Sequence, residues 1–136
     1  MKFRKLQLKD EKDLLQLLPQ LTNRQIILNA KELIRNKNCH SIVIEHEKKV
    51  IGFGQIYVCP TPVEGYFGII ENIIVDKSFR KMGLGKKIME KLIEIGKKNG
   101  AKKIDLTSNP SRIEARNLYE SLGFQLRNTG IFRLKL

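Results

Sequence analysis

The stretch Val75-Asp76-Lys77-Ser78-Phe79-Arg80-Lys81-Met82-Gly83-Leu84-Gly85-Lys86 joins a predicted strand to a predicted helix. Before it, the run Ile69-Ile70-Glu71-Asn72-Ile73-Ile74-Val75 is rich in β-branched residues and predicts a strand over residues 67–75 that is buried on both faces. After it the apolar period changes to 3.6, which predicts an amphipathic helix over residues 83–98. A strand that passes through a short loop into a helix is typical of α/β domains.

The loop between this strand and helix has the properties of a phosphate-binding site. Its glycines, Gly83 and Gly85, let the backbone approach a ligand closely, and the N–H groups of a first helical turn have no partners within the helix. The helix dipole adds to their attraction for phosphate oxygens. A P-loop is excluded because Arg80 stands at its first glycine position, and a dinucleotide fingerprint is excluded because Ile88 stands at its third. A helix start that binds no ligand is the alternative interpretation of the loop alone.

The remaining patterns predict one α/β domain with a mixed sheet over residues 1–136, in the order β-α-α-β-β-β-α-β-α-β-β. A helix that follows Asp10 ends at Pro19, and Thr22-Asn23-Arg24-Gln25 and Ser111-Arg112-Ile113-Glu114 have the form of capping boxes that open two further helices. The expected strands cover residues 3–8, 40–45, 50–58, 67–75, 103–106, 124–126 and 131–136, the last two forming a hairpin, and the expected helices cover residues 11–18, 22–36, 83–98 and 111–122.

Composition limits the class of protein. The chain has 136 residues with 41% hydrophobic and 29% charged residues, as in an ordinary globular domain. No apolar run reaches the roughly 18–20 residues that span a bilayer, so we expect a soluble cytoplasmic protein with no membrane partner. Cys39 and Cys59 are expected to be reduced thiols, and no metal site is expected. The net charge of +12 favours an anionic partner, although the basic residues are scattered in twos and threes.

Two motifs resemble those of one enzyme family. Arg80-x-x-Gly83-x-Gly85 after a β-branched strand resembles the [Q/R]-x-x-G-x-[G/A] signature of GNAT-type N-acetyltransferases, which grips the pyrophosphate of acetyl-CoA. Ala115-x-x-Leu118-Tyr119-Glu120-x-x-Gly123-Phe124 is similar to the family's A-x-x-L-Y-x-x-x-G-F segment. The order of elements also fits over the whole chain, while the specific motifs lie between residues 70 and 124.

The resemblance implies a function. It implies a single GNAT-like domain that takes acetyl-CoA as cosubstrate and moves its acetyl group directly to a primary amine of a small molecule or peptide. Two alternatives remain, a catalytically inactive GNAT-like protein that binds acyl-CoA and a basic nucleic-acid-binding module. The second alternative is disfavoured because the sequence has no recognised groove-reading motif.

The resemblance also implies which residues contact the cosubstrate. The family commonly has Asn at the position of Arg112, three residues before Ala115, and Asn109 is the candidate to replace it, which leaves the role of Arg112 open. The expected contacts are the strand backbone at Ile73, Ile74 and Val75, the side chain of Arg80, the backbone N–H groups of Lys81, Met82, Gly83, Leu84, Gly85 and Lys86, and the residues Asn109 and Ala115.

Tyr119 and Glu71 are the candidate catalytic residues. A phenol has a pKa of about 10 and a free thiol about 8.5, so Tyr119 can protonate the departing thiolate as a general acid. Its alternative role is that of a core residue with its hydroxyl at the rim. Glu71 stands alone in an apolar strand, where burial would raise the pKa of its carboxyl and suit it to act as a base, directly or through water. Its alternative role is that of an outward-facing residue or an ion-pair partner.

The acceptor amine has no diagnostic pattern. We expect the two N-terminal helices and residues 60–65 to shape its site, and the net charge of +12 favours acceptors that are neutral or carry an acid group over polyamines. An exposed edge strand would also allow a homodimer to form.

Overall fold

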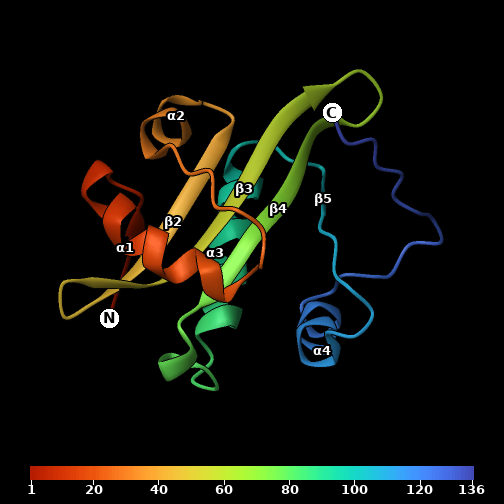
Figure 1. The fold of residues 1–136 in the computed structure, drawn as a ribbon. Coiled ribbons are helices and arrows are strands. Elements are labelled where there is room, and N and C mark those ends of the chain that lie inside the picture. Colours follow the sequence, from red (N-terminus) through yellow and green to blue (C-terminus); the bar gives the residue numbers. More distant parts are fainter.

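The computed structural model describes residues 1–136 as a mixed sheet with helices on both faces (Figure 1). The strands pair in chain order, β1 to β4 as antiparallel neighbours and β5 parallel to β4. The five strands are β1 (Lys2–Lys5), β2 (Cys39–His46), β3 (Lys49–Thr61), β4 (Gly65–Val75) and β5 (Lys103–Asp105). The α/β class with a mixed sheet is confirmed.

The helices cover both faces of this sheet. The α-helices are α1 (Glu11–Leu17), α2 (Ala30–Arg35), α3 (Leu84–Lys98) and α4 (Ile113–Ser121), and the short 3-10 turns are η1 (Leu8–Asp10), η2 (Leu18–Gln20) and η3 (Lys77–Phe79). In Figure 1, α1 and α2 lie on one face, α3 lies behind the other, and α4 lies below β5 at the lower right. None of these helices has both the length and the apolar character that a bilayer crossing requires.

Each face of the sheet has its own apolar core. On the α3 face, Ile88, Met89 and Leu92 are fully buried against the strands. On the α1 face, Leu14 and Phe53 belong to the second cluster. Full burial of such a side chain stabilises the fold by roughly 1.5–3 kcal/mol. The apolar residues whose 3.6-residue spacing predicted α3 are therefore the residues that pack against β3.

The helix expected from Thr22 to Asn36 is mostly absent. Residues 22–29 are not helical, and α2 begins at Ala30, where Asn29 Oδ1 accepts the Glu32 N–H (3.2 Å). The Thr22 hydroxyl instead accepts the N–H of Arg24, two residues on (3.1 Å). A hydroxyl that accepts a backbone N–H only two residues on favours a local turn over a helix cap, so the predicted capping box is wrong.

Asp10 precedes α1 as predicted, but its side chain does not cap the helix. Its carboxylate receives two hydrogen bonds from Arg4 (both 2.8 Å) and one from the Gln7 N–H (2.8 Å). Arg4 also pairs with Glu45 (2.7 Å). The carboxylate therefore ties β1 and the following turn together.

The C-terminal hairpin expected over residues 124–126 and 131–136 does not form. No strand follows β5, so the order of elements ends after α4, and Phe132 is 101% exposed. Alternation of apolar and polar residues stabilises a strand only where a neighbouring strand accepts its hydrogen bonds and a core covers one side. The second predicted capping box is also wrong, because Ser111 Oγ donates to Asn109 Oδ1 (2.8 Å) and Arg112 takes the cap position of α4.

Candidate active site

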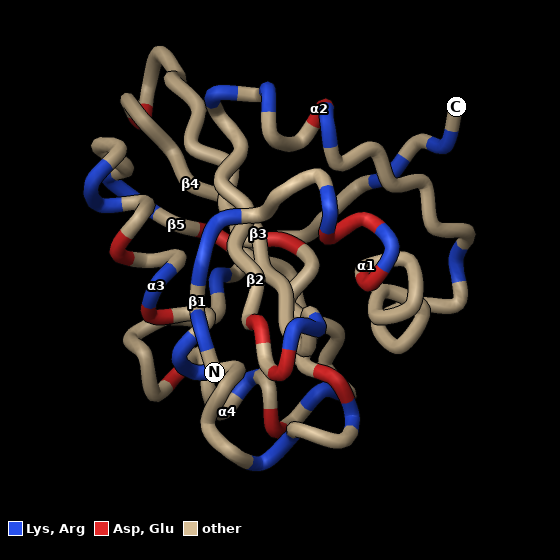
Figure 2. The backbone as a smooth tube through the Cα atoms, turned by 90° about the vertical axis from the view of Figure 1, so that its left-hand side faces the viewer, with Lys and Arg blue, Asp and Glu red and all other residues tan.

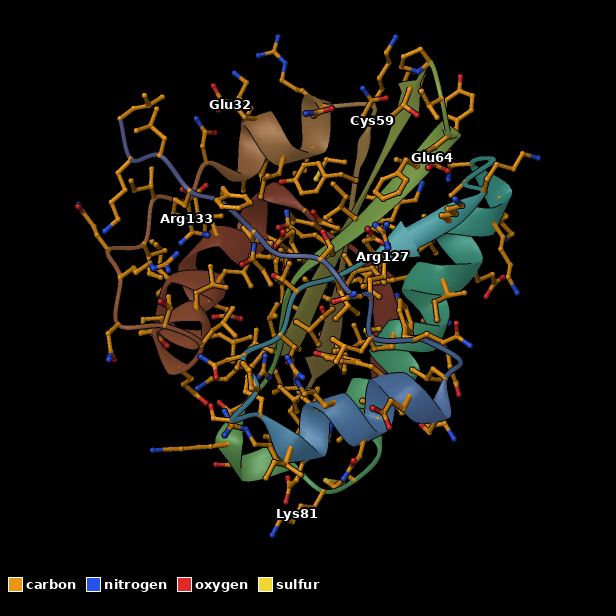
Figure 3. The ribbon with its side chains drawn as sticks, turned by 90° about the vertical axis from the view of Figure 1, so that its right-hand side faces the viewer. Glu32, Cys59, Glu64, Lys81, Arg127 and Arg133 are labelled. Atoms are coloured by element: carbon orange, nitrogen blue, oxygen red, sulfur yellow. The ribbon has the colours of Figure 1, made fainter.

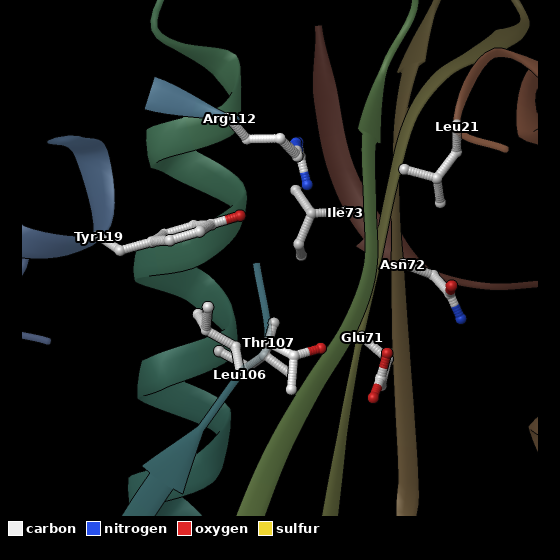
Figure 4. A pocket seen from close by; sticks show the side chains of 9 residues that line it. Leu21, Glu71, Asn72, Ile73, Leu106, Thr107, Arg112 and Tyr119 are labelled. Carbon is white, nitrogen blue, oxygen red and sulfur yellow. The ribbon is translucent and has the colours of Figure 1, made fainter. Parts of the chain in front are cut away.

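A pocket opens where β4 and β5 separate. The two strands pair only from Phe67–Ile69 to Lys103–Asp105, and beyond Ile69 the edge of β4 that faces β5 has no partner strand. A pocket of about 170 Å³ lies there (Figure 4). It is lined by Leu21, Ile70, Glu71, Asn72, Ile73, Leu106, Thr107, Arg112 and Tyr119.

A β-bulge bends β4 at this opening. Phe53 pairs with Ile74 and Gln55 pairs with Glu71, so Asn72 and Ile73 together stand opposite Gly54. Asn72 is in the left-handed region, at φ +57°. Such a bulge leaves one extra residue outside the ladder of hydrogen bonds and increases the local twist. The bulge therefore places unpaired backbone groups beside the pocket.

The pocket brings together three of the predicted site residues and Arg112. Figure 4 shows the Tyr119 hydroxyl and the Arg112 guanidinium both directed from the α4 side toward Ile73, with Glu71 on the opposite side of β4. Tyr119 is 8% exposed, and its ring packs edge-on against Phe124 with 6.2 Å between centroids. Its hydroxyl points into the pocket that Tyr119 lines (Figure 4).

Glu71 is exposed, so the expectation that burial surrounds its carboxyl is wrong. The expectation that β4 is buried on both faces is also wrong, because Ile69 is 41% exposed and Asn72 is exposed. The physical reason is that α1 packs over β3 and α2 packs over β2, which leaves this face of β4 without a covering helix. The role of Glu71 as a base stays a prediction, and its position at the pocket is compatible with it.

The loop before α3 has the free donors that a phosphate ligand needs. None of the backbone N–H groups of residues 81–86 has an acceptor within the chain. Gly83 has φ +76°, and a Cβ added at Gly83 or Gly85 would meet nothing within 4 Å. Open space in front of unpaired N–H groups at a helix start fits the pyrophosphate of acetyl-CoA.

The side chains of this loop differ in what they can contribute. Arg80 Nε donates to the Val75 carbonyl oxygen (3.0 Å), which ties the guanidinium to the end of β4. Leu84 is buried in the α3 core, so only its backbone faces outward, whereas Met82 is exposed. Lys81 projects into solvent at the end of the molecule where α3 begins (Figure 3). The loop does not line the 170 Å³ pocket, which holds the candidate catalytic residues.

Asn109 and Ala115 lie outside the pocket lining. Asn109 Oδ1 accepts the N–H and the hydroxyl of Ser111 (2.9 and 2.8 Å), and Ala115 packs half-buried against the α3 core. Their contact with the cosubstrate stays a prediction. Arg112, by contrast, lines the pocket and forms none of the chain's ion pairs.

Sequence reasoning missed a polar cluster next to Glu71. Gln55 is buried at 2% exposure, and its amide contacts Cys39, Ser41 and Asn72. Burial, with further contributions from Cys39 and Glu71, raises the pKa of the nearby Tyr57 hydroxyl to about 12. One signal was available, because Gln55 is the only polar side chain in the apolar stretch of residues 50–58 apart from Tyr57.

A larger hollow of about 410 Å³ lies between α1 and η3, but the carboxylates that line it, Asp13 and Asp76, accept hydrogen bonds from backbone N–H groups. Asp13 accepts the Val50 N–H (3.0 Å), and Asp76 accepts the Ser78 N–H (2.8 Å). The bond from Ser78 is the main cause that lowers the pKa of Asp76. Asp13 thus ties α1 to β3, and Asp76 fixes the turn that leads into the α3 loop.

Charge is spread over many elements. Figure 2 shows Lys and Arg on β1, around α3 and along the C-terminal segment, with Asp and Glu between them. Several of the acidic residues neutralise neighbouring lysines, as in the pairs Lys86–Glu90 and Lys103–Glu64.

Known proteins share both the sequence pattern and this fold. Residues 6–124 match the model of the Acetyltransferase (GNAT) family. The chain belongs to this family. It is 29% identical over 103 residues to glucosamine 6-phosphate N-acetyltransferase of Trypanosoma brucei brucei, a match that covers 73% of this chain and 68% of the relative. This GNAT chain also superposes on a crystal structure of a Trypanosoma brucei acetyltransferase with a TM-score of 0.86 and 28% identity, covering 99% of both chains.

A more distant structure shares the fold alone. The aminoglycoside N-acetyltransferase AAC(6')-Iy, solved in complex with CoA, superposes with a TM-score of 0.82 at 20% identity and 99% coverage of both chains. The matches of the GNAT chain span between 54% and 68% of the length of its curated relatives. Family membership and the fold are thus shown.

Proposed function

We propose that this GNAT protein transfers the acetyl group of acetyl-CoA directly to a primary amine of a small molecule or peptide. The observation that carries the proposal is the pocket at the opening of the sheet, which joins Glu71, the bulge at Ile73 and the Tyr119 hydroxyl. These groups supply the proton acceptor, the hydrogen-bond donor and the proton donor that acetyl transfer to an amine requires.

The cosubstrate would be held by the loop and by the free edge of β4. Arg80 and the N–H groups of residues 81–86 would bind its pyrophosphate, and the backbone from Ile73 to Val75 would pair with the amides of its pantetheine arm. Asn109 and Ala115 are the further predicted contacts of that arm. Acetyl-CoA supplies an acetyl group already activated as a thioester.

Three groups of the chain then act on the carbonyl oxygen, the amine and the departing sulfur. An N–H of the β4 bulge binds the carbonyl oxygen, and removal of one such donor typically costs about 10²–10³-fold in kcat. Glu71 takes the proton of the amine, directly or through water, and its exposure lets that proton pass to solvent. Tyr119 gives a proton to the departing sulfur, and its burial excludes bulk water from that position.

Arg112 and the net charge favour an acceptor that is neutral or carries an acid group. An unpaired guanidinium at the pocket attracts a carboxylate or phosphate and repels a second ammonium group. Glucosamine 6-phosphate, named as the substrate of a relative, combines a primary amine with a phosphate. It is therefore the first acceptor to test.

The experiment is a panel of amines with acetyl-CoA, in which free thiol release is followed and the acetylated product is identified. The panel includes amino sugar phosphates, amino acids, peptides and polyamines, each with a no-enzyme control. The proposal expects amine-dependent thiol release that is strongest for acceptors bearing an acid group. Binding of acetyl-CoA without turnover on any amine would instead support an inactive acyl-CoA-binding protein.

A further inference from the structure

The bulge in β4 is held by hydrogen bonds between side chains of three strands. Asn72 Nδ2 donates to Gln55 Oε1 (3.0 Å), and Gln55 Nε2 donates to Ser41 Oγ (3.1 Å). The same Nε2 donates to Cys39 Sγ (3.6 Å). Every polar group of the Gln55 amide is therefore paired, as a side chain that is only 2% exposed requires.

Asn72 has a backbone conformation that needs support. Its φ of +57° lies in the left-handed region, which few residues other than glycine adopt and in which asparagine is enriched. On the α3 face, the side chains of Ile73 and Ile88 fill the space above Gly54, where an added Cβ would lie 2.8 Å from Ile73 Cδ1 and 2.7 Å from Ile88 Cγ2. The bulge is thus confined between α3 on one face and the Gln55 amide on the other.

This confined backbone borders the pocket. Asn72 and Ile73 both line it, and the pairing of β4 with β5 has already ended at Ile69. We propose that Gln55, acting through Asn72, is a positioning residue that holds an N–H of the bulge where it binds the carbonyl oxygen of the acetyl group. The proposal rests on the proposed function, since it concerns the donor of that same reaction.

Two substitutions break the chain of hydrogen bonds at different points. Asn72→Gly removes the amide but keeps the left-handed conformation accessible, and Gln55→Leu removes the central amide at similar volume. Because a donor displaced by a fraction of an ångström loses much of its effect, we expect kcat to fall about 10–100-fold in each variant. KM for acetyl-CoA should stay near the wild-type value, since the α3 loop is untouched. If Gln55 and Asn72 only stabilise the fold, the two variants should have a lower thermal stability without a fall in kcat at unchanged KM.

The matched control is Asn99→Ala. Asn99 Nδ2 donates to the Ile95 carbonyl oxygen (2.8 Å) at the far end of α3 from the loop. This variant also loses one asparagine hydrogen bond, but it should keep both kcat and KM.

A measurement without acceptor separates this proposal from the proposed function. Acetyl-CoA labelled with carbon-13 at the acetyl carbonyl is bound to wild type, Asn72→Gly, Gln55→Leu and Asn99→Ala, and the carbonyl resonance is recorded by NMR. We expect a shift relative to free acetyl-CoA in wild type and Asn99→Ala that is lost in the other two, at unchanged binding affinity. An unchanged shift and kcat in Asn72→Gly and Gln55→Leu would overturn the positioning role alone. Failure of the wild type to bind acetyl-CoA would overturn the proposed function and the positioning role with it.

Discussion

Replacing Tyr119 by Phe removes one hydroxyl and leaves the ring in place. The ring packs on Phe124, and the hydroxyl forms no hydrogen bond within the chain, so no buried partner is left unpaired. The free energy of unfolding should therefore change by less than about 0.5 kcal/mol. If Tyr119 is the general acid, kcat should fall about 10²–10⁴-fold, which is about 3–5 kcal/mol at 1.36 kcal/mol per tenfold change in rate.

The assay measures kcat and KM by thiol release on the best acceptor, together with urea unfolding of each protein. Tyr66→Phe is the matched control, because Tyr66 is half exposed at the other end of β4 and should keep wild-type kcat. The loss in Tyr119→Phe should fall on kcat with acetyl-CoA affinity retained, since the proton is needed only as the carbon–sulfur bond breaks. Normal kcat under conditions where chemistry limits the rate would show that Tyr119 only packs, and weaker acetyl-CoA binding at normal kcat would show that it only positions the cosubstrate.

Further predictions concern the base Glu71, the phosphate-binding loop before α3, and the ion pairs of Arg4 with Asp10 and Glu45. Glu71→Gln should lower kcat/KM about 10²-fold or more, and an unchanged kcat/KM would exclude Glu71 as the base. Acetyl-CoA at 100 times its Kd should stabilise the wild type by about 2.7 kcal/mol, seen as a rise in Tm, and Gly83→Val should abolish that rise because of the φ of +76° and the filled ligand space. Arg4→Met should lower the free energy of unfolding in urea by about 3–5 kcal/mol, because it strands the Asp10 carboxylate at 3% exposure, and a loss below 1 kcal/mol would contradict this. Burial raises the pKa of Asp10, but the hydrogen bonds from Arg4 and the Gln7 N–H outweigh burial and lower the pKa overall. The unfolded state therefore binds more protons, so the stability that is present above about pH 4 should be lost as the pH falls. Arg4→Met should show a smaller dependence of stability on acid pH.

The fold could be predicted where apolar periods coincide with packing partners. The row of Leu84, Ile88 and Leu92 predicted a helix over residues 83–98, and α3 spans Leu84–Lys98 because that row packs on the sheet. The same reasoning was wrong for residues 22–29 and 124–136. Their apolar spacing resembles that of a helix and a strand, but only Leu28 and Phe124 pack against the cores, while Ile27, Ile131 and Phe132 are exposed. A period alone cannot show whether a packing partner exists.

The sequence predicts only those residues of the candidate site that lie in a short linear motif. The Arg80 loop and Tyr119 lie in linear patterns, and the structure places Tyr119 and Glu71 at one pocket. Gln55 was missed because its importance depends on strand register, in which one extra residue in β4 brings Asn72 to its amide. The exposure of Glu71 was missed for a related reason, since it depends on α1 and α2 packing over β3 and β2 rather than over β4, which no local pattern shows.

The central claim is that the acetyl group passes directly from acetyl-CoA to an amine. The most direct test incubates the protein with carbon-13-labelled acetyl-CoA, first alone and then with glucosamine 6-phosphate and the other amines of the panel, and measures by mass spectrometry both the intact protein and the products. If transfer is direct, the protein keeps its mass in the absence of amine, and a labelled N-acetyl product forms when the right amine is present. A labelled acetyl group that stays on the protein, or no labelled amide with any amine, would contradict it.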